Sequence, residues 1–492
     1  MIEYHLPILQ ILVPLVAAPI CVLLRRAALA QGFSIAVCWT TFAMSIALLL
    51  RVAEVGTISY DLGGWPAPWG IVYRVDLLSA FILLFVSGIG AIVITYAPRS
   101  LASEIPREKR YLFCTTYLLC LTGLLGIAIT GDLFNLFVFL EISSLSSYAL
   151  ISLGKSRRAL PAAFQYLVMG TIGATFILIG IGLMYMLTGT LNMADMAVRI
   201  RAEEGLRAAL VAFAFLSVGI SLKMALFPLH AWLPNAYAYA PSVVTAFLAA
   251  TATKVSVYIL LRFVFTVFGV EFAFEDMSLD VVLGPLALAG IFVASTVAIF
   301  QRDIKRMLAY SSVAQIGYIV LGISFASVTG LTGGIVHLFN HAMIKGGLFM
   351  AMGCIALRLG SVEIDDMRGV GRRMPLTMSA WALGGLGLIG MPVTVGFVSK
   401  WYLISAALEI GWWPVAVLVL LSSLLALVYV WRVVEVAYFQ QPSERAAEAR
   451  EAPLAMLIPT WVLIGATVVF GLWTSLSVGV ARRAAQLLLG AP

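Results

Sequence analysis

Long apolar runs, separated by short polar loops, repeat along the whole chain. Each run is close to the length of about 20 residues that an α-helix needs to cross a bilayer. Fourteen such segments can be placed, near residues 5–24, 31–51, 75–96, 111–130, 132–152, 161–187, 207–238, 243–268, 282–300, 308–326, 330–357, 377–409, 414–437 and 454–474. The pattern predicts an all-α polytopic membrane protein with about fourteen transmembrane helices.

The seventh and twelfth segments, 207–238 and 377–409, are too long for one simple helix, and both contain proline. Pro228 and Pro392 each remove a backbone hydrogen bond, which predicts that helices seven and twelve are broken. Two broken helices five spans apart predict two five-helix repeats, inverted because five is odd. The alternative is that proline and glycine are simply common in membrane helices.

The repeat pattern divides the chain into four parts. They are an N-terminal three-helix segment at 1–110, a first repeat at 111–268, a second repeat at 282–437, and a loop, last transmembrane helix and C-terminal tail at 438–492.

Composition supports the membrane class: 62% of the 492 residues are hydrophobic and 11% are charged. A water-soluble domain of this size is never so apolar. The five cysteines lie in apolar runs without metal-ligand spacing, so we expect small buried side chains and no metal site. The chain begins directly with an apolar run, which we interpret as the first span and not as a cleaved signal.

The net charge of +7 comes largely from arginine in short loops and indicates topology, with no nucleic-acid partner expected. The odd-numbered loops carry the basic residues Arg25, Arg26, Arg99, Arg107, Lys109, Arg110, Lys155, Arg157, Arg158, Arg302, Lys305, Arg306, Arg358, Arg368, Arg372 and Arg373. The eighth loop is acidic. Positive loops stay in the cytoplasm, so we expect both termini outside, in a multi-pass protein of the bacterial cytoplasmic (inner) membrane.

One carboxylate, Glu141, lies in the otherwise apolar run Phe134–Ile142. An ionised group at that depth costs about 2.5–3.5 kcal/mol even on the gentler insertion scales. Such a cost makes Glu141 a candidate functional residue that needs a partner.

Four of the seven lysines fall inside predicted spans: Lys223, Lys254, Lys345 and Lys400. Lysine is the basic side chain that loses its proton most readily when desolvated, which suits a proton relay. The alternative for each is a snorkelling or structural ion pair, although Lys254 is too deep in its span to snorkel comfortably.

Span eleven carries His337, His341 and Lys345 at i, i+4 and i+8, so the three share one helical face. Histidine titrates near neutral pH and can pass a proton in either direction. Metal binding lacks further ligands, and a structural role through bonds to neighbouring helices stays open. His230, two residues after Pro228, is either a point where protons enter or a cap for freed carbonyls.

These residues predict a line from Glu141 through Lys223, Lys254 and the span-eleven group to Lys400. Glu141 and Lys223 are expected to pair, each lowering the cost of the other's charge. A proton arriving on Lys254 would weaken the hold of Lys223 on its own proton, which moves protons laterally. The rivals from other classes are a membrane scaffold and a membrane enzyme, and no nucleophile–base pair supports the latter.

Several motifs resemble those of one known family. They are the Glu of span five, Lys before Phe-Pro-Leu-His-Ala-Trp-Leu-Pro in span seven, Thr-Lys-Val in span eight, His-Leu-Phe-Asn-His in span eleven and Gly-Phe-Val-Ser-Lys in span twelve. With the fourteen spans, they resemble the antiporter-like subunits shared by respiratory complex I, membrane-bound hydrogenases and Mrp-type cation/proton antiporters. The resemblance implies functional roles for Glu141, Lys223, Lys254, His337, Lys345 and Lys400.

Within that family, the runs Gly131–Ile142 and Thr188–Asp195 look most like the D subunits of Mrp antiporters. The resemblance implies a proton-translocating subunit of a multisubunit Na⁺/H⁺ antiporter, without a cofactor. Its partners would be A-, B-, C-, E-, F- and G-like membrane subunits, H⁺ and Na⁺. The alternatives are a proton-pumping subunit of complex I or a membrane-bound hydrogenase, and a subunit of an inorganic-carbon uptake complex.

Overall fold

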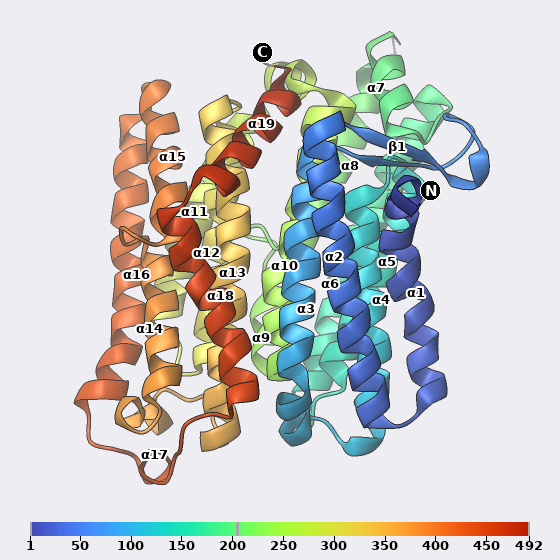
Figure 1. The fold of residues 1–492 in the computed structure, drawn as a ribbon. Helices are drawn as coiled ribbons and strands as arrows, with labels where there is room; N and C mark the ends of the chain where they lie inside the picture. The colour runs from blue at the N-terminus through green and yellow to red at the C-terminus, as the bar shows by residue number, and fades with distance from the viewer. Residues whose placement is uncertain (1, 203–205, 491–492) are drawn as a thin grey trace.

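A computed structural model describes residues 2–202 and 206–490 as a bundle of long, nearly parallel helices (Figure 1). Thirteen helices in the described part of the chain are long and apolar enough to cross a membrane. The α-helices are α1 (Leu6–Leu24), α2 (Ala27–Val55), α3 (Leu77–Glu104), α4 (Arg110–Ile129), α5 (Leu133–Ser152), α6 (Ala159–Thr188), α7 (Met193–Ala202), α8 (Leu206–Met224), α9 (Leu233–Tyr239), α10 (Ser242–Leu261), α11 (Leu279–Ile299), α12 (Ile304–Ser324), α13 (Val328–Leu359), α14 (Pro375–Ile389), α15 (Val395–Glu409), α16 (Trp413–Phe439), α17 (Glu444–Ala447), α18 (Leu454–Leu472) and α19 (Ser475–Leu489).

The twelfth predicted crossing, 377–409, is the pair α14 and α15, each 15 residues long. Neither is long enough to span alone, and the turn between them contains Pro392. The other predicted break is also present: α8 ends at Met224, and Pro228 lies in the non-helical stretch before α9. The predictions of an all-α membrane fold and of broken helices seven and twelve are therefore confirmed.

Each five-crossing group folds in the same order. The first is α4, α5, α6, α8 with α9, and α10, and the second is α11, α12, α13, α14 with α15, and α16. In both, the third helix packs against the broken one, as α6 does on α8 and α13 on α15. The groups meet where α10 contacts α13 and where α9 contacts α12. This seam places the basic residues of the two groups near one another.

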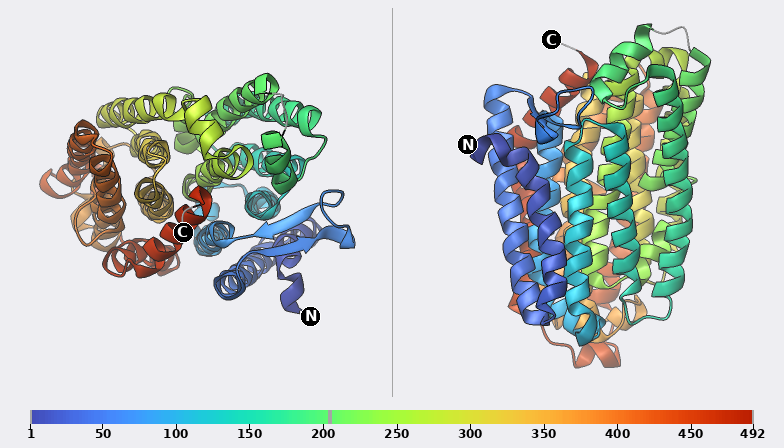
Figure 2. Two further views of the ribbon diagram at one scale, coloured as in Figure 1. Left: turned by 90° about the horizontal axis from the view of Figure 1, so that it is seen from above. Right: turned by 90° about the vertical axis from the view of Figure 1, so that its right-hand side faces the viewer.

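The hairpin, the short helix α7 and the last helix were not predicted from the sequence pattern. Strands β1 (Ile58–Asp61) and β2 (Val72–Val75) form an antiparallel hairpin over the ends of the N-terminal helices (Figure 2). The short helix α7 lies near it. The residues expected to form a C-terminal tail instead form α19, a helix that packs on α13 and α3. The alanines of α19 face the bundle. Alanines in a 15-residue helix are a weaker signal than the apolar run of about 20 residues that identifies a span.

Both described ends of the chain lie at one end of the bundle, together with the hairpin and α7 (Figure 1). We call this the termini end and the other the opposite end. Helices α18 and α19 run across the bundle in front of the seam and contact α13 and α3. The last crossing thereby joins the second repeat to the N-terminal helices.

Close backbone packing at the second break depends on glycine. A Cβ added at Gly396 would lie 1.9 Å from the carbonyl oxygen of Gly387, so α14 and α15 would have to separate. We expect Gly396→Ala to lower the stability of the purified protein by about 1–3 kcal/mol, as overpacking does. Gly465→Ala in α18, where a Cβ meets nothing within 4 Å, is the control for thermal unfolding in detergent. Equal stability of the two variants would contradict the prediction.

Candidate functional site

Glu141 and Lys223 form an ion pair between α5 and α8, as the sequence predicts. The Nζ of Lys223 lies 3.3 Å from Oε1 of Glu141 and donates a second hydrogen bond, 2.9 Å long, to Oγ of Ser144. The Lys223 side chain is only 4% exposed, and that of Glu141 is 26% exposed. The lysine therefore depends on the carboxylate for charge compensation more than the carboxylate depends on the lysine.

A small cavity of about 20 Å³ adjoins Lys223 and is lined by serines of α5 and by α10. A site needs roughly 10–15 Å³ to hold a water molecule. This cavity is thus large enough for one water, and it lies between the Glu141–Lys223 pair and the helix that carries Lys254.

Lys254 is buried in the middle of α10, where its residue is 1% exposed. Its Nζ donates to the carbonyl oxygen of Ala249 and, at 3.4 Å, to Oγ of Thr253. Among the described residues it has no acidic partner within 4 Å. A buried amine held only by neutral oxygens can exchange its proton without breaking an ion pair.

The basic residues of α13 differ in how they are partnered. The Nδ1 of His337 lies 2.8 Å from Oγ of Ser399, and its Nε2 lies 2.9 Å from Oε1 of Gln315. Lys345 donates a 2.7 Å bond to the carbonyl oxygen of Leu308. Both ring nitrogens of His341 are buried without a hydrogen-bond partner among the described residues. Such a group calls for water, which would connect it to its neighbours.

His341 sits at the centre of the basic groups. Its ring centroid is 6.2 Å from that of His337, and Lys254, Lys345 and His337 all lie near enough for their charges to act on it. The interface of α10 and α13 therefore brings Lys254 of the first repeat near His337, His341 and Lys345 of the second.

Lys400 closes the line in α15. Its Nζ donates to the carbonyl oxygens of Leu388 at 3.3 Å and Ile389 at 2.9 Å, and to Oγ of Ser423 at 2.8 Å. The ammonium also lies 4.9 Å from the ring centre of Tyr318. The two carbonyls are freed where α14 ends, so the break predicted at Pro392 supplies the ligands of the lysine.

Direct contacts join only parts of the predicted line. Glu141 touches Lys223, and His337 contacts the serine that precedes Lys400. No hydrogen bond joins Lys223 to Lys254 or Lys254 to His341 among the described residues. His230 lies apart, in the turn before α9, with its ring 6.2 Å from that of Tyr310. The described residues contain no group of three His, Cys, Asp or Glu that could hold a metal.

The polar side chains that bind these groups were not predicted from the sequence. They are Ser144, Gln315, Tyr318, Ser399 and Ser423. Hydroxyl side chains in membrane helices usually bond to their own backbone, so nothing in the sequence separates a ligand from filler. An amide such as Gln315 inside an apolar span is the one signal available.

Lys305 is a correction to the loop assignment. The sequence places it among basic loop residues, whereas the structure puts it in the first turn of α12, where its residue is only 4% exposed. Its Nζ donates a 2.7 Å bond to the carbonyl oxygen of Ala240. This partner is 65 positions away in the chain, so the burial of Lys305 depends on how α9 packs against α12 and has no local sequence signal.

Comparison with known proteins finds a family match and long, similar relatives among subunits of membrane complexes. Residues 130–426 match the family described as NADH:quinone oxidoreductase/Mrp antiporter, transmembrane. The N subunit of the NADH-quinone oxidoreductase of Desulforudis audaxviator is 44% identical over 484 residues, which is 95% of this chain and 96% of that protein. The D subunit of the Na⁺/H⁺ antiporter of Alkalihalophilus pseudofirmus is 30% identical over 471 residues, with 95% and 94% covered.

The fold has a counterpart in a solved complex. A chain of the membrane-bound sulfane sulfur reductase, an archaeal respiratory membrane complex, superimposes with a TM-score of 0.90 at 31% identity. The match covers 99% of this chain and 98% of that one. The broken helices and the basic groups beside them therefore belong to a fold that also occurs in a respiratory membrane complex.

Glu141→Gln should destabilise the protein, because it leaves a buried lysine charge with only neutral partners. Breaking a buried pair typically costs about 3–5 kcal/mol, and the partly exposed carboxylate puts this one at or below the low end. Thermal unfolding in nanodiscs measures the loss. Glu3→Gln, which removes an exposed partner of Arg51, is the control, and an equally small effect for both variants would contradict the prediction.

Replacing the two histidines should destabilise the protein to different extents. His337→Leu leaves the Gln315 amide without its partner, at about 1–3 kcal/mol, whereas Ser399 keeps its bond to the carbonyl oxygen of Gly396. His341→Leu removes two nitrogens that have no partner among the described residues, so it orphans no described group and should cost less than His337→Leu. Parallel thermal unfolding of the two variants tests this, and a more severe loss for His341→Leu would be inconsistent with the contacts described.

Proposed function

Because the chain belongs to the NADH:quinone oxidoreductase/Mrp antiporter transmembrane family, we propose that it carries protons as one subunit of a multisubunit membrane complex. The observation that carries the proposal is the series of buried basic groups, with a single acid at one end. Lys223, Lys254, Lys345 and Lys400 are each at most 6% exposed. Only Lys223 among them has a carboxylate partner in the described chain. A purely structural core gains nothing from four such charges.

The relay works through changes in the electrostatic interaction between neighbouring charged groups, from Glu141 to Lys400. At an effective dielectric constant of about 20, unit charges 4 Å apart interact by about 4 kcal/mol. Separation of Glu141 from Lys223 removes an attraction of that order and releases the lysine's proton toward Lys254. The charge on Lys254 then acts on His341 and, through His337 and Ser399, on Lys400. A change of charge on each group thereby shifts the proton of the next group, while the side chains stay in place.

Water completes the gaps that side chains leave. The cavity beside Lys223 is large enough for about one water molecule, and the two nitrogens of His341, which have no partner among the described residues, offer both a donor and an acceptor site. The second broken helix provides further polar surface, since its freed carbonyls face Lys400. Lys345 acts as a side branch of the relay, because its ammonium is held by a carbonyl in the first two turns of α12.

Two assemblies are candidates for the complex. The motif resemblance and the 30% identical antiporter relative favour a Na⁺/H⁺ antiporter, in which proton movement is exchanged for sodium. The 44% identical oxidoreductase relative favours a redox-driven assembly of the complex I type. Its higher identity gives this second candidate the stronger support from sequence similarity. Both use the same relay and differ in what drives it.

The distribution of basic loops supports a bacterial cytoplasmic-membrane protein with its termini end outside. Partner subunits would cover the apolar flanks of the bundle, where large side chains such as Phe164 and Met186 on α6 are exposed. No cofactor is part of the proposal, so any electron transfer belongs to other subunits.

Lys223→Ala should abolish ion-coupled pH changes when the whole complex is reconstituted in vesicles. We expect the rate to fall by about tenfold or more, equivalent to about 1.4 kcal/mol, because the relay loses its first carrier. Lys109→Ala, a loop substitution, is the control. A pH-sensitive dye reports transport, and an unchanged rate in a folded, assembled Lys223→Ala complex would refute the relay.

The same vesicles identify the driving reaction. A sodium gradient that drives dye quenching supports the antiporter, whereas quenching driven by a reductant and quinone supports the redox assembly. Purification from native membranes with identification of the co-purifying chains gives an independent answer: small antiporter subunits in one case, iron–sulfur subunits in the other.

A further inference from the structure

A second polar cluster lies on α10, between the relay and the termini end. Lys254, Tyr258 and Arg262 follow one another at i, i+4 and i+8 and so share one face of the helix. They span about 12 Å along the axis at 1.5 Å per residue. At Arg262 the helix passes into a π-helical segment, Arg262–Phe268, a distortion that frequently marks functional positions.

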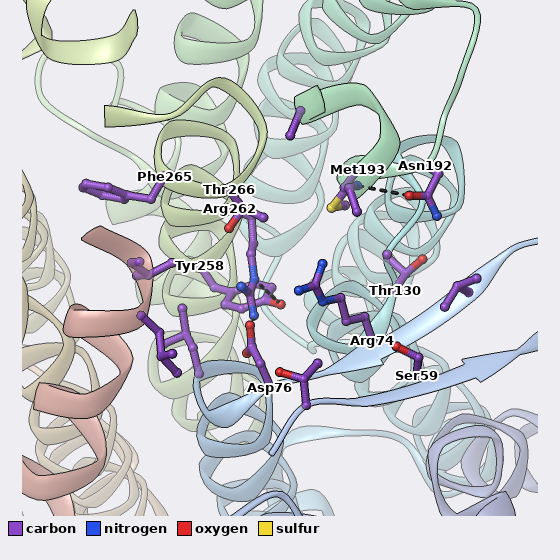
Figure 3. A pocket seen from close by; sticks show the side chains of 18 of the residues that line it. Ser59, Arg74, Asp76, Thr130, Asn192, Met193, Tyr258, Arg262, Phe265 and Thr266 are labelled. Atoms are coloured by element: carbon purple, nitrogen blue, oxygen red, sulfur yellow. Dashed lines mark hydrogen bonds and ion pairs between the residues drawn. The ribbon is translucent and has the colours of Figure 1, made fainter. Parts of the chain in front are cut away.

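Arg262 is held by groups at the start of α3 and on α10 (Figure 3). Its Nη2 lies 2.5 Å from Oδ1 of Asp76 and 2.8 Å from Oγ of Ser79, while its Nε donates a 2.9 Å bond to the hydroxyl of Tyr258. The guanidinium carbon is 5.0 Å from the centre of the Tyr258 ring. With 8% exposure, this is a fixed charge in a nearly dry position.

A cavity of about 670 Å³ begins directly beyond Arg262, at the termini end. The hairpin, the start of α7 and the apolar side of α19 form its walls. Arg74 of β2 also lines it (Figure 3). Asp76 is the one acidic residue among the described lining residues, so the cavity is net positive. Its size would admit water close to the relay.

The cluster cannot pass a proton from Lys254 to this cavity. A hydrogen-bonded relay needs groups that both accept and donate, and a guanidinium has no acceptor and keeps its protons. The Tyr258 hydroxyl is occupied, because it donates to the carbonyl oxygen of Ala128 at 2.8 Å, accepts from Arg262 and lies 3.1 Å from Oγ of Ser79.

Asp76 offers no alternative route. Burial alone would raise the pKa of this carboxyl, but the Arg262 charge and hydrogen bonds from Arg262 and Ser79 more than offset that effect and lower the pKa to about 2. The carboxylate therefore remains charged near neutral pH, takes up no proton there, and holds the guanidinium in place.

We propose that Arg262, held by Asp76, is an electrostatic seal that stops protons and small cations from crossing between Lys254 and the cavity at the termini end. A fixed guanidinium excludes cations in the same way in other membrane pores. The seal rests on the proposed function, since it gives that relay its direction: protons on Lys254 continue along the seam to α13 and Lys400.

The test measures passive proton leak in vesicles that contain the whole complex, with an imposed potassium diffusion potential and neither a sodium gradient nor a reductant. Arg262→Met should raise the leak by roughly tenfold, because the repelling charge is gone. The double variant Asp76→Asn, Arg262→Met should leak equally, and it leaves no orphaned charge that prevents folding. Arg74→Met, which removes an arginine from the same cavity, is the matched control and should stay at the wild-type level.

Adding Lys254→Met to the leaking variants identifies the path. A leak through the relay should return to the wild-type level when its lysine is removed. An unchanged leak in the folded Arg262 variants, a leak that persists without Lys254, or an equal leak from Arg74→Met would each overturn the seal. The leak is measured without a driving reaction, so it is separate from the loss of driven transport in Lys223→Ala, which tests the proposed function itself.

Discussion

The cost of holding ammonium groups away from water governs this structure. Each buried lysine meets that cost differently: Lys223 by an ion pair with Glu141, Lys254 by neutral oxygens of its own helix, and Lys400 by carbonyls at the end of α14. Uncompensated charges of this kind cost several kcal/mol each. The helices that supply these ligands must therefore keep their positions, which explains why close glycine contacts and broken helices surround the same residues.

The two breaks solve a problem of membrane backbones. A transmembrane helix normally satisfies its own polar groups, and a break leaves carbonyls that need donors. Here the indole of Trp232 donates to the carbonyl of Leu222 near the first break, and Lys400 donates to Leu388 and Ile389 at the second. At the second break, a functional charge and an orphaned backbone stabilise each other. Loss of a proton from Lys400 would consequently change its hydrogen bonds to the carbonyl oxygens at the end of α14.

The relay and the Arg262 cluster use opposite chemistry on the same helix. Lys254 can lose a proton, whereas the guanidinium two turns away cannot. In the proposed mechanism, placing them on one face of this helical stretch separates a site that would exchange protons from the cavity at the termini end. The ion pair with Asp76 joins α10 to α3, which lies outside both repeats. The N-terminal helices thereby take part in insulating the relay.

The order of residues along the chain was enough to predict the crossings, the two broken helices and the Glu141–Lys223 pair, because apolar length, proline and the cost of a buried charge are all readable along one dimension. Packing in three dimensions was needed to learn which oxygens hold each lysine, that His341 has no partner in the described chain while His337 has two, and that Lys305 is buried. The Asp76–Arg262 pair joins residues 186 positions apart, and no local pattern specifies a contact that depends on how α3 and α10 pack. The hairpin and α19 were missed for a related reason: their stability comes from the bundle beneath them, and their own sequences lack the length and apolar character of a span.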